Sequence, residues 1–284
     1  MKIIRAKTAG FCMGVSLALQ KLDNALEKYS GRICTLGPII HNPQVLEHYA
    51  KNGVSCLKSS EDVCNGDIVV IRAHGIVRKE EEALKNRGIV IIDATCPKVK
   101  KAQISIKNAT ENGKRLLLFG EESHPEVRGL VSYAGSDAYV FGSMKELVSL
   151  DLDKNNKYVL ASQTTQDINI FLEIKTYLKN KFPDLVILET ICGATSERQE
   201  EARDIASYVD VMIIIGGRES GNTRRLADVA ALKCPETYLC ERIEELDEKK
   251  FKKNLQIGLT AGASTPKSLI EAAEKWLTSL RTRQ

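Results

Sequence analysis

Residues Lys2–Val15, KIIRAKTAGFCMGV, contain the pattern that decides the fold: a short apolar run, then a cysteine, then the start of a helical pattern. The same order recurs at two further cysteines, so that the set is Cys12, Cys96 and Cys192. None of the three shares a local CxxC pair with another. Three thiolates are too few to close a four-cysteine zinc or iron–sulfur site. A single centre held by these cysteines would therefore keep one coordination position open for a substrate.

The 284-residue chain has an ordinary globular composition, with 43% hydrophobic and 27% charged residues. Its net charge of +4 is too small to indicate a nucleic-acid partner. Its longest apolar runs, such as Val211–Ile215, are far shorter than the roughly 20 residues that span a bilayer. The N-terminus enters a strand-like run without a signal-peptide core. We therefore expect a cytoplasmic protein that binds neither nucleic acid nor membrane.

The chain has eight cysteines, and its size makes a disulfide scaffold unnecessary, so reduced thiols are expected. Five of them lie outside the repeated pattern and are expected to be ordinary small apolar residues: Cys34, Cys56, Cys64, Cys234 and Cys240.

Short β-branched runs alternate with helical patterns along the whole chain, which predicts an α/β fold with mostly parallel sheets. The predicted strands are Lys2–Ala6, Ile33–Leu36, Ile68–Arg72, Ile89–Asp93, Arg115–Phe119, Tyr158–Ala161, Leu185–Glu189, Val211–Ile215 and Gln256–Thr260. The clearest helical patterns are Ser16–Tyr29, Lys98–Asn112, Ser196–Tyr208, Thr223–Leu232 and Pro266–Leu280.

Polar loops follow the predicted strands at nearly constant distances from the three cysteines. The first loop comes 29, 28 and 28 residues after its cysteine, at His41, His124 and Ser220 respectively. The second comes 62, 68 and 72 residues after it, at His74, Thr164 and Ser264. This spacing predicts three pseudo-equivalent α/β units.

The predicted units are 14–95, 96–191, and 192–284 completed by 1–13, whose strand Lys2–Ala6 supplies the last strand of the third unit. Ligands of open α/β sheets bind beyond the carboxyl ends of the strands. We therefore expect the three units to face one centre with their polar loops.

Histidines, hydroxyls and an amide at strand ends are suited to hydrogen bonding an anion. Ser220 and Asn222 precede one predicted helix and Ser264 precedes another, where backbone N–H groups favour phosphate. For each serine alone, simple helix capping is the favoured interpretation, and the joint placement of these residues with the histidines favours anion binding instead. The chain has no GxxxxGK phosphate loop and no complete GxGxxG fingerprint, so a nucleotide is not indicated.

Glu126, two residues after His124, is a candidate proton donor to a reaction at the centre. The nearby acids Glu121, Glu122 and Glu219 compete with it, and the residues alone do not separate the four.

Nine motifs together resemble the family of 4-hydroxy-3-methylbut-2-enyl diphosphate reductases, also called the LytB/IspH family, over essentially the whole chain. They are AGFCMGV at Ala9–Val15, HN at His41–Asn42, RAHG at Arg72–Gly75, DATCP at Asp93–Pro97, HPEV at His124–Val127, QTT at Gln163–Thr165, TICGAT at Thr190–Thr195, SGN at Ser220–Asn222 and TAGAS at Thr260–Ser264.

The resemblance implies one [4Fe-4S] cluster at the centre, with Cys12, Cys96 and Cys192 as ligands and a fourth iron open to the 4-hydroxyl oxygen of the substrate. It implies that Glu126 supplies a proton and that Thr164 orients the hydroxyl group. It also implies a set of diphosphate-binding residues: His41, His74, His124, Ser220, Asn222 and Ser264. Gly221 departs from the family, which often has a second serine there, so no side-chain role is carried over to it.

The implied reaction is reductive dehydroxylation of (E)-4-hydroxy-3-methylbut-2-enyl diphosphate to isopentenyl and dimethylallyl diphosphate, the last step of the non-mevalonate isoprenoid pathway. A ferredoxin or flavodoxin is the implied electron donor. The alternative is a non-redox [4Fe-4S] hydratase or dehydratase of the aconitase type. The two enzymes share an open iron and differ in whether turnover consumes a reductant.

Overall fold

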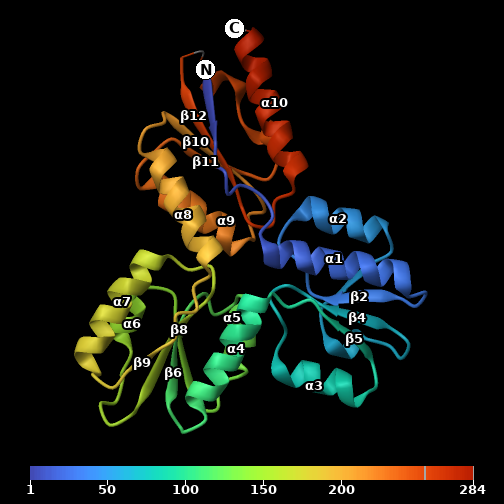
Figure 1. Ribbon diagram of the computed structural model, residues 1–284, viewed down its shortest axis with the longest axis vertical. Coiled ribbons are helices and arrows are strands. Elements are labelled where there is room, and N and C mark those ends of the chain that lie inside the picture. The colour runs from blue at the N-terminus through green and yellow to red at the C-terminus, as the bar shows by residue number, and fades with distance from the viewer. Residues whose placement is uncertain (253, 284) are drawn as a thin grey trace. The chain divides into compact units, whose positions relative to one another are not determined.

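The computed structural model describes residues 1–252 and 254–283. It contains three four-stranded sheets, and all strand pairs in them are parallel (Figure 1). This confirms the predicted α/β class. By contacts the chain forms two compact units, the first comprising Met1–Ser16, Ile40–His48 and Gly193–Gln284 and the second comprising Leu17–Ile39 and Tyr49–Cys192. The second unit contains two of the sheets and the first unit contains one.

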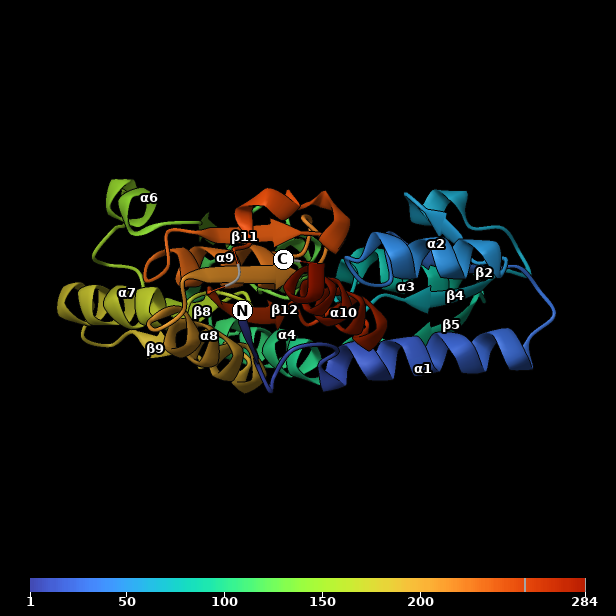
Figure 2. The ribbon, with the colours of Figure 1, turned by 90° about the horizontal axis from the view of Figure 1, so that it is seen from above.

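One sheet of the second unit has the strand order β3-β2-β4-β5. Its strands are β2 (Ile33–Leu36), β3 (Ser55–Leu57), β4 (Ile68–Ile71) and β5 (Val90–Asp93). Helix α1 (Met13–Lys28) lies along this sheet (Figure 2) and buries Leu22 and Ala25. Helix α3 (Arg78–Asn86) adds Leu84 to the core. Between β2 and β4 the chain forms α2 (Pro43–Lys51), most of which belongs to the first unit, then β3 and a short 3₁₀ turn (Ser60–Asp62).

The other sheet of the second unit has the order β7-β6-β8-β9 and is covered on both faces. Its strands are β6 (Arg115–Phe119), β7 (Ala138–Phe141), β8 (Tyr158–Ser162) and β9 (Val186–Ile187). Helices α4 (Pro97–Thr110) and α5 (Pro125–Val131) pack on one face through a cluster that includes Ile106 and Leu130. Helices α6 (Met144–Ser149) and α7 (Ile168–Lys181) pack on the other through Leu147 and Phe171.

The sheet of the first unit has the order β1-β12-β10-β11, which joins the two ends of the chain. Its strands are β1 (Lys2–Arg5), β10 (Val211–Ile215), β11 (Thr237–Cys240) and β12 (Gln256–Ala261). Strand β1 pairs with β12 from Lys2 opposite Gln256 to Arg5 opposite Leu259. Two 3₁₀ turns follow β11, Ile243–Glu245 and Glu248–Lys250.

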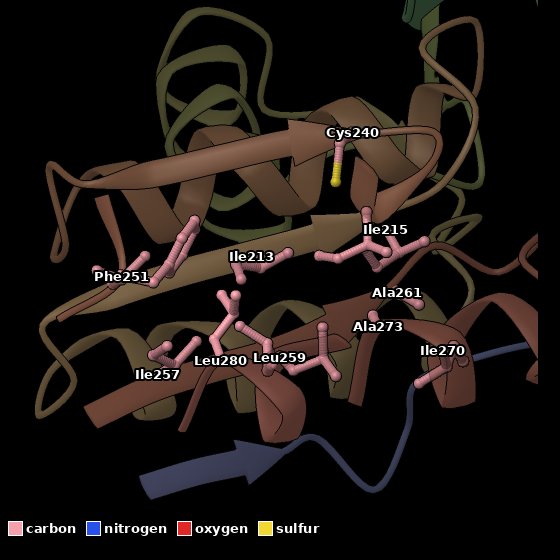
Figure 3. Packing of buried hydrophobic residues seen from close by; sticks show 13 residues of the cluster. Ile213, Ile215, Cys240, Phe251, Ile257, Leu259, Ala261, Ile270, Ala273 and Leu280 are labelled. Carbon is pink, nitrogen blue, oxygen red and sulfur yellow. The ribbon is translucent and has the colours of Figure 1, made fainter. Parts of the chain in front are cut away.

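Alternating residues of β10 and β12 send their side chains to opposite faces of this sheet. Ile213, Ile215 and Leu259 pack against α10 (Lys267–Arg283) around Phe251 (Figure 3). On the other face, Met212 and Ile214 pack against α8 (Gly193–Ala206) and α9 (Gly221–Ala231). Strands that are covered on both faces explain the nearly continuous apolar runs of the sequence.

The three sheets share one topology. The strands β2, β6 and β10 lie inside their sheets, and the strands that follow them in the chain, β3, β7 and β11, lie at an edge. These edge strands, β3, β7 and β11, are absent from the sequence prediction. Their residues are half-buried for the most part, as are those of β1, β5 and β9 at the opposite edges, which the sequence does predict. The boundaries predicted for the three units stay a prediction.

No helix in the described parts of the chain is both long and apolar enough to cross a membrane.

Candidate active site

Every predicted site residue follows the carboxyl end of a strand. One of the three predicted ligand cysteines follows a strand of each sheet. Cys96 follows β5, Cys192 follows β9 and Cys12 follows β1. Each cysteine N–H donates to a carbonyl oxygen in the second polar loop of its own sheet: Cys96 to Ala73 at 2.9 Å, Cys192 to Thr164 at 3.0 Å and Cys12 to Ala263 at 3.1 Å. The equivalence predicted from spacing therefore extends to the hydrogen bonds that hold the three cysteines.

Each of the three cysteines also precedes a long helix. Cys96 is the N-cap of α4, Cys12 precedes α1 directly and Cys192 precedes α8. The Val15 N–H donates a hydrogen bond to the Cys12 Sγ at 3.5 Å. The positive end of a helix dipole favours a thiolate. Half-buried thiols at such positions are suited to bind a soft metal centre.

The other five cysteines lack this placement. Cys34 and Cys240 are buried, and burial raises the pKa of their thiols to about 11 and about 12. Burial also raises the pKa of Cys234, although hydrogen bonds from neighbouring groups oppose the change. Cys56 and Cys64 are exposed. Protonated thiols are poor metal ligands, so these positions agree with the ordinary roles expected for them.

Glu126 and Thr164 form a buried polar pair at these strand ends. Glu126, in the first turn of α5, is 2% exposed, and Thr164, after β8, is 5% exposed. The Thr164 backbone N–H donates to Glu126 Oε1 at 2.6 Å and its hydroxyl donates to Oε2 at 3.0 Å. Burial raises the pKa of Glu126 to about 7, while these two hydrogen bonds act in the opposite direction. The carboxyl group can therefore hold a proton near neutral pH and release it.

The three competing acids have different surroundings. Glu122 and Glu219 are exposed, and Glu121 is half-buried. Burial is what shifts the pKa of a carboxyl group towards neutrality, so among the four only Glu126 is in the environment of a general acid.

His124 and His74 lie side by side in the second unit. Their rings meet edge to face with centroids 5.4 Å apart. His124 is the N-cap of α5, and its Nδ1 accepts a hydrogen bond from the Glu126 N–H at 3.1 Å. This leaves the proton of a neutral His124 ring on Nε2, where it can be donated to an anion. The loop of His74 needs Gly75, which has φ +74° and leaves no room for a Cβ beside Gln103.

These contacts connect the predicted residues of the second unit in one series. It runs from Cys192 through Thr164, Glu126 and His124 to His74, whose neighbour Ala73 holds Cys96. The structure thus brings together all the site residues predicted in the second unit.

The first unit brings together the other five predicted residues. Asn222 Oδ1 accepts from the Ala263 N–H at 3.0 Å, and the Ala263 carbonyl oxygen in turn holds Cys12. The Ser264 hydroxyl donates to the carbonyl oxygen of His41 at 3.0 Å. Ser220 caps α9, where its oxygen accepts from the Thr223 N–H at 3.3 Å. Ser220 therefore caps α9, as the capping interpretation predicts. The first turn of α9 presents further N–H groups beside Ser220.

Two residues that hold the Cys12 loop have no counterpart in the sequence prediction. Glu201 of α8 accepts from the Lys7 N–H at 2.7 Å and from the Thr8 N–H at 2.9 Å, and Arg198 donates to the carbonyl oxygen of Thr8. Burial acts to raise the pKa of Glu201, but the hydrogen bonds from Thr8 and Lys7 hold it below its usual value. Helix α8 is rich in charged residues, so no local signal distinguishes these two. His48, by contrast, is exposed in α2, as expected for a residue outside the site.

Three parallel sheets, each followed at one edge by a cysteine that precedes a helix and by two polar loops, define a class of α/β proteins built on a threefold-repeated, thiol-bearing unit. The family model described as LytB protein matches residues 3–278. The chain belongs to the LytB family.

The similar curated proteins carry one name. A 4-hydroxy-3-methylbut-2-enyl diphosphate reductase of Desulfovibrio desulfuricans is 62% identical over 286 aligned positions, covering 99% of this chain and 100% of the relative. A protein of the same name from Nitratidesulfovibrio vulgaris is 55% identical, with 99% and 100% coverage.

Two solved structures are similar over nearly the whole chain. The E-1-hydroxy-2-methyl-but-2-enyl-4-diphosphate reductase of Plasmodium falciparum superimposes with a TM-score of 0.92 at 28% identity, covering 98% of this chain and 88% of that one. A (E)-4-hydroxy-3-methyl-but-2-enyl diphosphate reductase, described as the terminal enzyme of the non-mevalonate pathway, has a TM-score of 0.71 at 38% identity, with 98% and 99% coverage.

Proposed function

We propose that this chain is a 4-hydroxy-3-methylbut-2-enyl diphosphate reductase, the terminal oxidoreductase of the non-mevalonate pathway. The family, the names of the full-length relatives and the buried Glu126–Thr164 pair support the proposal. In the overall reaction the allylic alcohol takes up two electrons and two protons. Its C–O bond breaks, a C–H bond forms and water leaves, giving isopentenyl and dimethylallyl diphosphate.

The proposed cofactor is one [4Fe-4S] cluster ligated by Cys12, Cys96 and Cys192, with the fourth iron open. The donor set fits it, because three half-buried thiols occupy equivalent positions before long helices. When bound, such a cluster supplies electrons and a Lewis-acidic iron for the leaving oxygen.

The diphosphate is assigned to imidazole, hydroxyl and amide donors from all three sheets: His41, His74, His124, Ser220, Asn222 and Ser264. These groups end parallel strands or begin helices, where backbone N–H groups add to the side-chain donors. Gly221, the first residue of α9, has no serine side chain, but its N–H is among those that a helix leaves without an internal partner.

Glu126 is assigned as the proton donor. A pKa of about 7 keeps a share of the carboxyl protonated at neutral pH, and burial shields the group from bulk water. Thr164 fixes both carboxyl oxygens and so sets the direction in which the proton leaves. Its hydroxyl group is also assigned to orient the substrate hydroxyl.

A ferredoxin or flavodoxin is the proposed electron donor, and the cytoplasm is the proposed compartment. Free thiols are expected in such a reducing environment.

Anaerobic reconstitution with iron and sulfide, followed by assay with a reduced carrier and (E)-4-hydroxy-3-methylbut-2-enyl diphosphate, tests the proposal. We expect two electrons to be consumed for each product formed. Conversion of the substrate without oxidation of the carrier would instead identify a non-redox hydratase or dehydratase, and a protein that binds no iron would contradict the cofactor.

A further inference from the structure

A basic groove lies beside the cysteine that begins α4. It has a volume of about 480 Å³, and its lining includes Lys21 of α1 together with Pro97, Lys100, Lys101 and Ile104 of α4. All these residues belong to the second unit. Pro97 directly follows Cys96, so the groove begins one residue from a proposed cluster ligand.

The charges of α4 are one-sided. The helix has four lysines and no acidic residue between Pro97 and Thr110. Lys98 and Lys100 occupy its first turn, where the helix dipole disfavours positive charge. Ion pairs with Asp93 and Glu81 account for Lys100, but the helix dipole does not account for Lys98.

The acid of the groove, Asp93, is already neutralised within the protein. Its carboxylate pairs with Lys100 at 3.0 Å, and its carbonyl oxygen accepts from Lys21 at 2.5 Å. Lys98 and Lys101 are exposed, and no carboxylate in residues 1–252 or 254–283 forms an ion pair with either. Their charges are thus available to a partner.

The groove also has an apolar part. Ile104 is 51% exposed, which is unusual for a large hydrophobic side chain of this protein. Leu17, 36% exposed, lies one helical turn before Lys21 and therefore on the same side of α1. An apolar centre with a charged rim is the composition of a protein–protein interface, and electron-transfer complexes use small interfaces that form by electrostatic steering.

We propose that this groove, lined by Lys21, Lys101 and Ile104, together with the exposed Lys98 one helical turn before Lys101, is the docking site of a small acidic one-electron carrier protein. The inference rests on the proposed function, which requires electrons at the cluster. Each docked carrier is oxidised by one electron, so two carriers dock and leave in succession during each turnover, and two protons accompany the electrons. Pro97, which lines the groove, is bonded to the proposed ligand Cys96, so the chain itself connects the docking surface to the cluster.

The test compares reconstituted holoenzymes with two matched charge reversals. One carries Lys98→Glu with Lys101→Glu. The control carries Lys145→Glu with Lys154→Glu, exposed lysines in and just after α6, which packs on the opposite face of the sheet from α4. Turnover is measured with a reduced acidic ferredoxin and, separately, with a reduced viologen dye.

With ferredoxin at low ionic strength, we expect kcat/KM of the α4 variant to fall by about tenfold or more, and that of the control to stay within about twofold of wild type. Salt should narrow the difference, while both variants keep the viologen rate. Ile104→Ser should lower kcat/KM with ferredoxin at all salt concentrations.

If the two charge-reversed variants have the same kcat/KM with ferredoxin and normal turnover with viologen, the docking site is wrong. The proposed function would remain intact. If wild type turned over with neither reductant, the proposed function itself would fail. In a third outcome, wild type binds a single-stranded oligonucleotide, only the α4 variant loses that binding, and the ferredoxin kinetics are unchanged. This result would overturn the proposal in favour of a nucleic-acid surface.

Discussion

Thr164 donates hydrogen bonds to both carboxyl oxygens of Glu126, from its N–H at 2.6 Å and from its hydroxyl at 3.0 Å. The two residues are 38 positions apart in the chain, and they follow the neighbouring strands β6 and β8 of one sheet. The Thr164 carbonyl oxygen accepts from the Cys192 N–H at 3.0 Å. One residue thus joins a buried acid to a proposed cluster ligand, so that changes at Thr164 should be measurable in both proton transfer and cluster properties.

Replacing Glu126 by Gln should lower kcat by about 10²- to 10⁴-fold, because the amide keeps the shape but cannot deliver a proton. Iron content and substrate affinity should stay close to wild type. Turnover near the wild-type rate would assign the proton to another group. Glu122→Gln is the control, since Glu122 is exposed, and it should leave turnover unchanged.

The stability of the protein should depend on pH through Glu126. Burial raises the pKa of this group from its ordinary 4.5 to about 7 in the folded protein. Between these values the folded state holds a proton that the unfolded state has released. The free energy of unfolding should therefore decrease as pH rises from about 4.5 to about 7. Melting temperatures of wild type should fall more over this range than those of Glu126→Gln, and parallel curves would contradict the assignment.

Thr164→Val removes only the hydroxyl donor to Glu126 Oε2 and keeps the backbone bond. Hydrogen bonds from Thr164 lower the pKa of Glu126, so their partial loss should move that pKa further upwards. We expect kcat to fall by about tenfold or more, as for the loss of a hydrogen bond to a charged group, and the alkaline limb of the pH–rate profile to shift to higher pH. Thr164→Ser restores the hydroxyl and should recover both kcat and the pH of the alkaline limb. If Thr164→Ser is as impaired as Thr164→Val, packing by the threonine methyl group is the dominant effect.

Cys96→Ser should remove the visible absorbance of the cluster and most of the bound iron. The matched control is Cys56→Ser, because Cys56 is an exposed thiol on the edge strand β3. It should keep iron, absorbance and activity. A brown, iron-loaded Cys96→Ser protein would remove Cys96 from the set of ligands.

Asn222→Asp separates a structural role from a binding role. An aspartate still accepts the hydrogen bond from the Ala263 N–H, but it loses the Nδ2 donor and adds negative charge. If Asn222 binds the diphosphate, the Kd of the substrate should rise by at least about tenfold. An affinity like that of wild type would leave Asn222 only the task of holding the Ser264 loop.

Local patterns predict much of this fold. Parallel strands that are covered on both faces have nearly continuous apolar sequences. The bounds of β2, β6 and β10 therefore agree with their predictions to the residue. The edge strands β3, β7 and β11 are missing from the prediction, although the equally half-buried edge strands β1, β5 and β9 are part of it. The repeated spacing of cysteines and polar loops reflects the common order of elements in the three sheets.

The sequence by itself determined the α/β class and the strand ends on which the site residues lie, because periodicity and spacing are properties of neighbouring residues. Residue chemistry alone left Glu126 indistinguishable from Glu121, Glu122 and Glu219, and only the family resemblance singled it out. The tertiary structure supplies the physical difference, by burying Glu126 against Thr164. It also recruited Arg198 and Glu201 to the Cys12 loop. Burial and hydrogen bonding between distant segments change the pKa and orientation of a group, and no local pattern encodes them.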